Sequence, residues 1–272
     1  MKDNYVLGSV RSEQKRLNIQ SIIFENETRH TLEQAGIKPG MRCVDLGCGV
    51  GDTAFLLAKL VGGKGHVTGI DISENAIGTC KRRMKEEKRT NLEFFVRSVY
   101  DTKLKEHSFD LVFSRFMFQH LKDPEKAILE MSRIAKKNGV LAIEELDHGH
   151  WLCYPPEPSL EELRKMYVKL LRMNGADPFI ARKLYKIFTD LDFQPNVSAY
   201  TVTLTTDKKP FNTLGMQLAA TLEPQIMRNG LMSKKEFGRM SERILKYSAN
   251  PHGLVLYATG FRVWSKNNPA VF

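Results

Sequence analysis

Long apolar runs, a secretory leader and paired cysteines are all missing from the 272-residue sequence. No apolar run approaches the roughly 20 residues that a helix needs to cross a bilayer, so no membrane partner is expected. The N-terminus has no apolar core behind a basic start, unlike a secretory signal. The four cysteines include no Cys-x-x-Cys pair, which argues against a disulfide framework and a zinc ribbon. We therefore expect a cytoplasmic protein without a metal site.

Charged residues are abundant, but charges of one sign are not grouped. The chain carries 41 Lys and Arg against 31 Asp and Glu, a net charge of +10. The basic cluster Lys81–Arg83, for example, is followed closely by Glu86 and Glu87. A basic excess can serve a polyanionic partner, whereas interleaved charges favour an ordinary solvated surface. A nucleic-acid partner therefore stays an alternative that the sequence does not favour.

Strand-like and helix-like segments alternate in the first half of the sequence. Apolar, strand-like segments occur at 41–46, 65–70, 92–96, 109–114 and 140–144. Helix-like segments lie at 53–60, 74–87 and 124–137. This alternation is typical of a parallel sheet with helices on both faces. It predicts an α/β fold for this part of the chain.

The most specific motif is a glycine-rich turn between the first predicted strand and helix, with Asp45 before it and Gly47, Gly49 and Gly51 within it. Glycine lets the backbone turn tightly and lets a ligand approach the main chain. The turn departs from the dinucleotide fingerprint G-x-G-x-x-G because Asp52 stands at its last glycine. The carboxylate of Asp45 would repel a pyrophosphate but attract an ammonium or sulfonium group.

A second carboxylate strengthens this signal. Asp71 ends the second predicted strand, where an acidic side chain can accept hydrogen bonds from both ribose hydroxyls. The glycine turn, Asp45 and Asp71 together indicate a ligand that combines a ribose with a positively charged group.

On these residues the sequence resembles the class I, seven-stranded Rossmann-like family of S-adenosylmethionine-dependent methyltransferases, over about residues 36–147. Segments around 5–17 and 175–188 are similar to a small-molecule branch of that family. The resemblance implies S-adenosyl-L-methionine as cofactor and S-adenosyl-L-homocysteine as product. It also implies a Rossmann-like three-layer sandwich with a mostly parallel seven-stranded sheet, N-terminal helices and a late helical cap insertion.

The resemblance further implies a set of cofactor-binding residues, namely Asp45, Gly47, Gly49, Asp71, Ile72, Val99, Tyr100, Ser114 and Arg115. The first three would line the methionine end, Asp71 would hold the ribose and Ile72 would pack beside the adenine. Many relatives have an acidic residue where this chain has Val99. Either Asp101 or the backbone of Val99 and Tyr100 therefore contacts the adenine edge.

The sequence after residue 150 has a different pattern. A proline-rich loop at 155–158 precedes helix-like segments at 160–171, 177–190, 211–229 (interrupted at Pro224) and 233–247, and strand-like segments at 197–205 and 254–264. We predict three parts: an N-terminal helical lead over 1–38, the cofactor-binding Rossmann-like core over 39–150, and a helical cap with the last two strands of the sheet over 151–272.

The acceptor is marked less clearly than the cofactor. Family members that methylate base amines carry Asn/Asp-Pro-Pro-Tyr/Phe after the fourth strand, and this chain has Ser114-Arg-Phe-Met117 there. Candidate general bases are His148 and His120, near the carboxyl ends of strands, where open α/β sheets bind ligands. The alternatives are structural: His120 could start a helix, and His148 could belong to a polar rim beside Trp151.

These features predict a methyltransferase that acts on an oxygen, nitrogen or carbon nucleophile of a small-molecule acceptor. One alternative, motivated by the net charge of +10, is an RNA or protein methyltransferase. A second is a cofactor-binding scaffold without catalysis.

Overall fold

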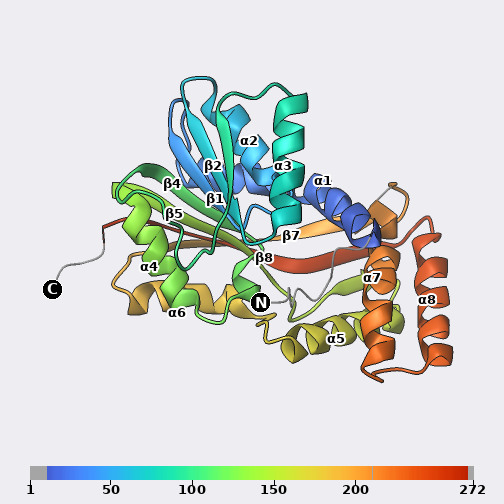
Figure 1. Ribbon diagram of the computed structural model, residues 1–272. Coiled ribbons are helices and arrows are strands. Elements are labelled where there is room, and N and C mark those ends of the chain that lie inside the picture. The colour runs from blue at the N-terminus through green and yellow to red at the C-terminus, as the bar shows by residue number, and fades with distance from the viewer. Residues whose placement is uncertain (1–10, 210, 269–272) are drawn as a thin grey trace. The chain divides into compact units, whose positions relative to one another are not determined.

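The structure is a computed structural model that describes residues 11–209 and 211–268 (Figure 1). In this part of the chain, eight strands form one sheet in the order β3-β2-β1-β4-β5-β8-β6, and β7 also pairs with β8. The strands are β1 (Arg42–Leu46), β2 (His66–Asp71), β3 (Leu92–Val96), β4 (Phe109–Arg115), β5 (Ala135–Asp147), β6 (Leu152–Tyr154), β7 (Asn196–Thr205) and β8 (Leu254–Lys266).

The α-helices are α1 (Arg11–Gln34), α2 (Asp52–Val61), α3 (Glu74–Glu86), α4 (Pro124–Ile134), α5 (Pro158–Met173), α6 (Leu184–Asp190), α7 (Leu214–Arg228) and α8 (Lys234–Ser248). Short 3₁₀ helices cover Phe118–His120, Ile180–Lys183 and Phe211–Thr213. None of the helices in the described part of the chain combines the length and the apolarity that crossing a bilayer requires. Helix α1 confirms the helical character predicted for much of the N-terminal lead, whose first ten residues lie outside the described residues.

The first five strands pair with one another in parallel. Helix α2 connects β1 to β2, α3 connects β2 to β3, and α4 connects β4 to β5. Asp45 on β1 is in register with Gly69 on β2 and Phe113 on β4. The carboxyl ends of these strands therefore meet at one edge of the sheet, where the glycine turn and the residues after β2 and β4 lie. This architecture confirms the predicted Rossmann-like α/β fold.

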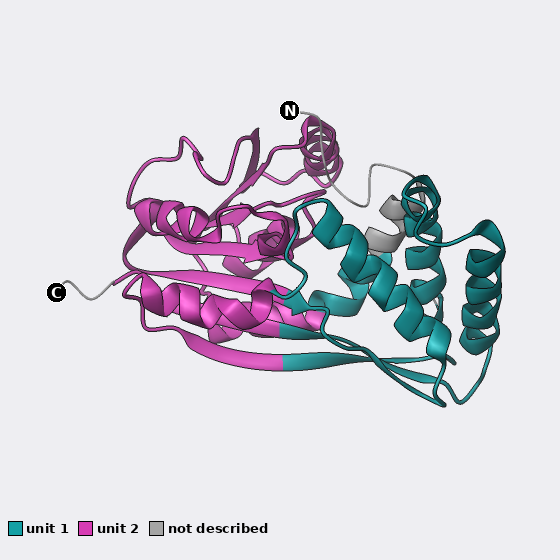
Figure 2. Cartoon of the chain, turned by 90° about the horizontal axis from the view of Figure 1, so that it is seen from below, with its two compact units in different colours: residues 1–25, 146–179, 200–260 teal, residues 26–145, 180–199, 261–272 magenta. Residues whose placement is uncertain are grey.

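The chain divides into two compact units that alternate along the sequence (Figure 2). Unit 1 comprises residues 1–25, 146–179 and 200–260, and unit 2 comprises 26–145, 180–199 and 261–272. The predicted division of the chain after residues 38 and 150 stays a prediction.

Unit 2 has an apolar core on each face of its sheet. Neighbouring residues of β1 contribute to opposite cores, because side chains alternate along a strand: Val44 packs with α4 and α6, and Cys43 packs with α2 and α3. Strands that are apolar on both faces are typical of parallel sheets covered by helices. The two cores hold β1, and with it the start of the glycine turn, in a fixed position.

Unit 1 has its own core, formed where α5, α7 and α8 pack together. Its fully buried members include Leu163 and Leu170 of α5, Leu222 and Ile226 of α7, and Ile244 of α8. Helix α7 continues through Pro224, where we predicted an interruption. Proline removes one helical hydrogen bond, but the buried residues on either side of it hold the helix together.

Two strands differ from their predicted bounds. Residues 152–154, expected to lead into a loop, form β6 and pair antiparallel with residues 254–256 of β8. The sheet therefore has one short strand more than the seven expected. The helix predicted over 124–137 ends at Ile134, and strand β5 begins at Ala135. Asn138 and Gly139 lie where the register between β5 and β4 shifts. Asn138 has a φ of 61°, and its backbone N–H donates to the carbonyl of Asn267, the residue directly after β8. The backbone N–H of Asn267 in turn donates to the carbonyl of Gly139, so this irregular stretch is bonded to the end of β8.

Candidate functional site

The glycine turn after β1 is held against the end of β2. The backbone N–H groups of Gly47 and Cys48 both donate to the carbonyl of Ile70, at 2.9 Å each. Gly47 has a φ of 69° and Gly49 a φ of 52°, in the left-handed region where side chains are strained. The turn then leads into α2, which begins at Asp52.

The two glycines have different surroundings. A Cβ atom at Gly47 would lie 2.5 Å from Sδ of Met117, whereas a Cβ atom at Gly49 would meet no atom within 4 Å. Gly47 is thus packed against the segment after β4. Gly49 faces open space, which a ligand could fill.

Alanine at Gly47 should destabilise the protein more than alanine at Gly49. Both changes put a side chain into left-handed backbone, at about 1–2 kcal/mol, and Gly47→Ala also pushes on Met117, at about 1–3 kcal/mol more. Unfolding in denaturant measures both losses. Adding Met117→Ala to Gly47→Ala should restore only the second part, and equal losses for the two alanine variants would contradict the packing of Gly47.

Asp45 is a buried carboxylate, 1% exposed, two residues before Gly47. The backbone N–H of Ala54 donates to it, but no described residue makes a hydrogen bond to its Oδ2. Burial raises the pKa of Asp45 to about 7, against the opposing attraction of the Arg115 guanidinium. An unbonded buried carboxylate oxygen is unfavourable, so this position suits a cationic group of a ligand.

Asp71 is fixed by the backbone on both sides. Its Oδ2 accepts the N–H of Gly49 and its Oδ1 accepts the N–H of Ser73, at 2.9 Å each. Each oxygen keeps a further lone pair for a ligand hydroxyl. Beside it, Ile72 is 65% exposed, and Val96, which is in register with Asp71, is 45% exposed. Exposed aliphatic side chains next to a fixed carboxylate suit a nucleoside.

The loop after β3 offers backbone groups and few side chains. The side chain of Val99 is buried in the core, and the hydroxyl of Tyr100 accepts the N–H of Asp123 at 3.1 Å. The Asp101 carboxylate is exposed and pairs with Lys103 at 2.6 Å. Of the two predicted alternatives for the adenine edge, this arrangement favours the backbone of Val99 and Tyr100.

Two residues at the end of β4, Ser114 and Arg115, act on the segment that carries the glycine turn. The hydroxyl of Ser114, fully buried, donates to the carbonyl of Leu46 at 3.1 Å and so joins β4 to β1 just before the turn. Arg115 donates to Oγ1 of Thr28 at 3.1 Å. Ser114 therefore holds the start of the glycine turn in position, while Arg115 contributes a positive charge near Asp45.

A model of the methyltransferase-domain family matches residues 37–205. The chain belongs to this methyltransferase family. The match includes the glycine turn, Asp71 and the segment after β4, and it confirms the family that these residues indicated.

Two curated relatives of this methyltransferase-family chain act on quinones by name. The 2-phytyl-1,4-naphtoquinone methyltransferase of Nostoc sp. is 34% identical over 113 residues, which are 41% of this chain and 49% of the relative. The demethylmenaquinone methyltransferase of Staphylococcus haemolyticus is 28% identical over 169 residues, 61% of this chain and 67% of the relative. The chain thus matches about half to two thirds of the length of these relatives.

The fold is also found among solved structures. The YcgJ protein of Bacillus subtilis has a TM-score of 0.61 and 15% sequence identity, covering 89% of this chain and 98% of that one. At this identity the likeness concerns the fold alone.

The two histidines predicted as bases lie in different units of this methyltransferase-family chain. His120 ends the 3₁₀ helix after β4 in unit 2, and its N–H donates to the carbonyl of Met117. His148, 1% exposed, lies in unit 1 among three aromatic rings. The ring centre of Tyr167 is 4.9 Å away, and those of Trp151 and Tyr257 are 6.3 Å away. Their catalytic roles stay predictions.

Sequence reasoning missed a buried polar pair beyond β4. Glu145, fully buried on β5, accepts hydrogen bonds from the backbone N–H and the side-chain amide of Gln119, at 3.2 and 3.3 Å. Oε1 of Gln119 has no hydrogen-bond partner among the described residues. The available signal was Glu144-Glu145, two acidic residues directly after the apolar segment 140–143.

Proposed function

We propose that this protein transfers the methyl group of S-adenosyl-L-methionine to a small-molecule acceptor. The observation that carries the proposal is the pair of carboxylates around the glycine turn. Asp45 offers a buried oxygen without a hydrogen bond, Asp71 offers a fixed carboxylate, and Gly49 borders open space near them. These groups fit the cationic amino acid end and the ribose of one elongated ligand.

The protein's own residues would bind and orient the cofactor. Asp45, Gly47 and Gly49 would line its methionine end, Asp71 would accept the ribose hydroxyls, and Ile72 would cover one face of the adenine. Val99 and Tyr100 would contribute backbone groups, with Ser114 and Arg115 supporting the turn and its charge balance.

The chemistry required of the side chains is limited. The bound cofactor supplies a methyl group already activated on a sulfonium. The chain has to align the acceptor nucleophile in line with that methyl group and exclude water. A general base, for which His148 and His120 are the candidates, is needed only where the nucleophile must lose a proton.

The names of the relatives support a lipophilic aromatic acceptor. Two of them are named for a naphthoquinone or a menaquinone precursor, and we propose an acceptor of that class, with an oxygen, nitrogen or carbon atom as the nucleophile. We also propose a cytoplasmic location. All four cysteines are free thiols, buried or half-buried, as a reducing compartment allows.

Calorimetric titration with S-adenosylmethionine and S-adenosylhomocysteine, at low and high salt, tests the proposal. We expect micromolar binding of both ligands with little dependence on salt. Turnover is then measured as S-adenosylhomocysteine release with naphthoquinones as acceptors. Absence of binding would overturn the proposed cofactor site.

Two further outcomes would favour the alternatives. Release of product with RNA, suppressed steeply by salt, would identify a polyanionic acceptor. Cofactor binding without turnover on any acceptor would instead identify a scaffold.

A further inference from the structure

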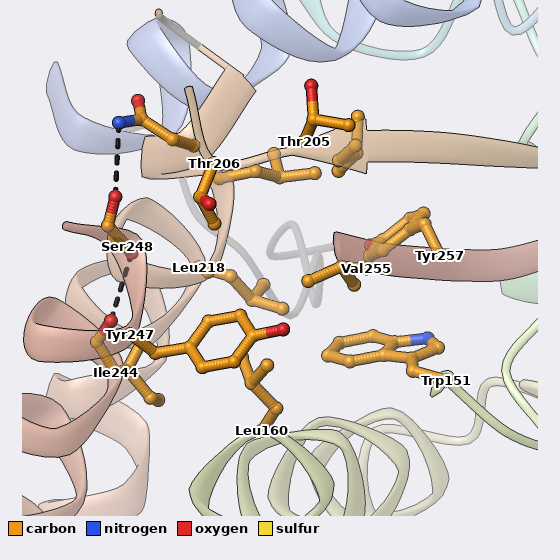
Figure 3. A pocket seen from close by; sticks show the side chains of 14 residues that line it. Trp151, Leu160, Thr205, Thr206, Leu218, Ile244, Tyr247, Ser248, Val255 and Tyr257 are labelled. Atoms are coloured by element: carbon orange, nitrogen blue, oxygen red, sulfur yellow. Dashed lines mark hydrogen bonds between the residues drawn. The ribbon is translucent and has the colours of Figure 1, made fainter. Parts of the chain in front are cut away.

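Unit 1 contains a small pocket of its own. It encloses about 40 Å³ between α5, α7 and α8 and the adjoining ends of β7 and β8. In Figure 3 the rings of Tyr247 and Trp151 approach the cavity from two sides, with Leu218, Val255 and Leu160 around them.

Most polar groups of this lining are occupied by the protein itself. The Tyr247 hydroxyl lies 2.9 Å from the carbonyl of Tyr154 and 3.0 Å from that of Leu254. The hydroxyl of Thr206 bonds the carbonyl of Gly253, and the hydroxyl of Ser248 bonds that of Ile244. The side chains therefore present mainly carbon to the cavity.

Two buried polar atoms of the lining, Oδ1 of Asn212 and Nε1 of Trp151, have no hydrogen-bond partner among the described residues. A buried water needs two to four polar partners, so two isolated groups do not make the pocket a polar site. Its volume of about 40 Å³ is also well below the roughly 150 Å³ of an apolar cavity that binds benzene. The size excludes an aromatic ring, but it suits the end of an aliphatic chain.

The aromatic wall of the pocket also contacts the candidate base. Trp151 and Tyr257 lie with ring centres 4.9 Å apart, and each lies 6.3 Å from the ring of His148. A ligand chain in the pocket would therefore touch the same aromatic residues that hold His148 in place. This links the pocket to the acceptor more directly than to any other ligand.

We propose that this pocket binds the terminus of an aliphatic chain carried by the acceptor. The acceptor is then a lipophilic compound with a saturated or prenyl-type tail. This inference rests on the proposed methyltransferase function, and it narrows the class of substrate.

Trp151 is a built-in reporter for this pocket. The sequence has two tryptophans, so Trp264→Phe leaves Trp151 as the only one. In the full chain with this change, we expect 11-bromoundecanoate to quench the fluorescence of Trp151 saturably, because bromine quenches on contact. Unbrominated undecanoate should compete and reverse the quenching.

Two substitutions that narrow the pocket test its location. Leu218→Phe should weaken the binding of the brominated chain about tenfold, since each excluded methylene corresponds to about fourfold in affinity. Gly215→Ala is a second variant that narrows the pocket less, because its added Cβ would lie 3.3 Å from Cγ2 of Ile244. Alanine also favours the helical conformation of α7, so this variant should fold. Leu245→Phe, on the exposed face of α8, is the matched control and should leave the affinity unchanged.

The readouts separate the two proposals. Quenching that does not saturate, or that is equal in Leu218→Phe and Leu245→Phe, would overturn the chain-binding pocket. Calorimetry with S-adenosylmethionine on the same variants reports the cofactor site in unit 2 independently. Absence of cofactor binding with intact, Leu218-dependent quenching would overturn the proposed function and leave the pocket established.

Discussion

Asp45→Asn should strongly weaken the binding of S-adenosylmethionine and at the same time stabilise the ligand-free protein at pH 8. The affinity should fall at least about 100-fold, because a buried charge pair loses one partner. The stability should rise because the wild type holds a carboxylate in a buried position with a pKa of about 7. Raising a carboxyl pKa from about 3.9 to about 7 corresponds to roughly 4 kcal/mol.

The difference in stability between Asp45→Asn and the wild type should depend on pH. The folded state binds the Asp45 proton more tightly than the unfolded state, so the stability of the wild type falls as pH rises from about 4 to about 7 and is then constant. Asparagine does not ionise, so the variant does not lose this stability as pH rises. The unbonded amide of the asparagine offsets part of the gain in stability. We expect Asp45→Asn to be more stable than the wild type by about 1–3 kcal/mol at pH 8.

Denaturant unfolding at pH 5 and pH 8 measures this difference. Asp110→Asn is the matched control: its carboxylate bonds Lys136 at 2.7 Å and the N–H of Arg42 at 2.9 Å, away from the glycine turn. That variant should lose stability and keep cofactor binding. A stability difference between Asp45→Asn and the wild type that is the same at both pH values would show that Asp45 is not the titrating group.

The same carboxylate makes cofactor binding depend on pH. A cationic ligand requires the ionised form, so affinity should fall about tenfold per pH unit below about pH 7 and be constant above it. Calorimetry in buffers of different ionisation enthalpy should detect one proton released on binding at pH 6.

The cofactor half of the molecule could be predicted because its signals are local. The positive φ of Gly47 favours glycine at that position, and Asp71 directly follows the strand-like segment 65–70. The parallel fold follows from the alternation of segments, since parallel neighbours need long crossovers. The glycine turn and Asp71 can each be read from a few adjacent residues, and the alternation can be read from the order of segments between residues 41 and 144.

The remaining features depend on residues far apart in the sequence. The family resemblance implies Ser114 as a cofactor-binding residue, but it gives no sign that the Ser114 hydroxyl donates to the carbonyl of Leu46, 68 positions away. His148 stands beside Trp151 in the sequence, but the rings of Tyr167 and Tyr257 that enclose it come from α5 and β8. Burial of this kind is set by tertiary packing, which no local pattern contains.

Asp71→Ala should lower the affinity for the cofactor at least about 100-fold, for two reasons. The carboxylate would hold the ribose, and it also accepts the N–H groups of Gly49 and Ser73, which would be left unbonded. Asp71→Asn keeps one acceptor oxygen and should lose less. Calorimetry with S-adenosylhomocysteine gives both values.

The ribose contact itself is tested with the 2′-deoxy analogue of S-adenosylhomocysteine. The wild type should bind this analogue about tenfold or more weakly than the parent compound, since a charge-assisted hydrogen bond is lost. In Asp71→Asn that ratio should shrink towards one, because the group that recognises the hydroxyl is already altered. Asp101→Asn, exposed and paired with Lys103, should keep the wild-type ratio. The ratio of the two affinities could instead be the same in the wild type and in Asp71→Asn. That result would show that Asp71 acts only by holding the glycine turn, and that other residues recognise the ribose.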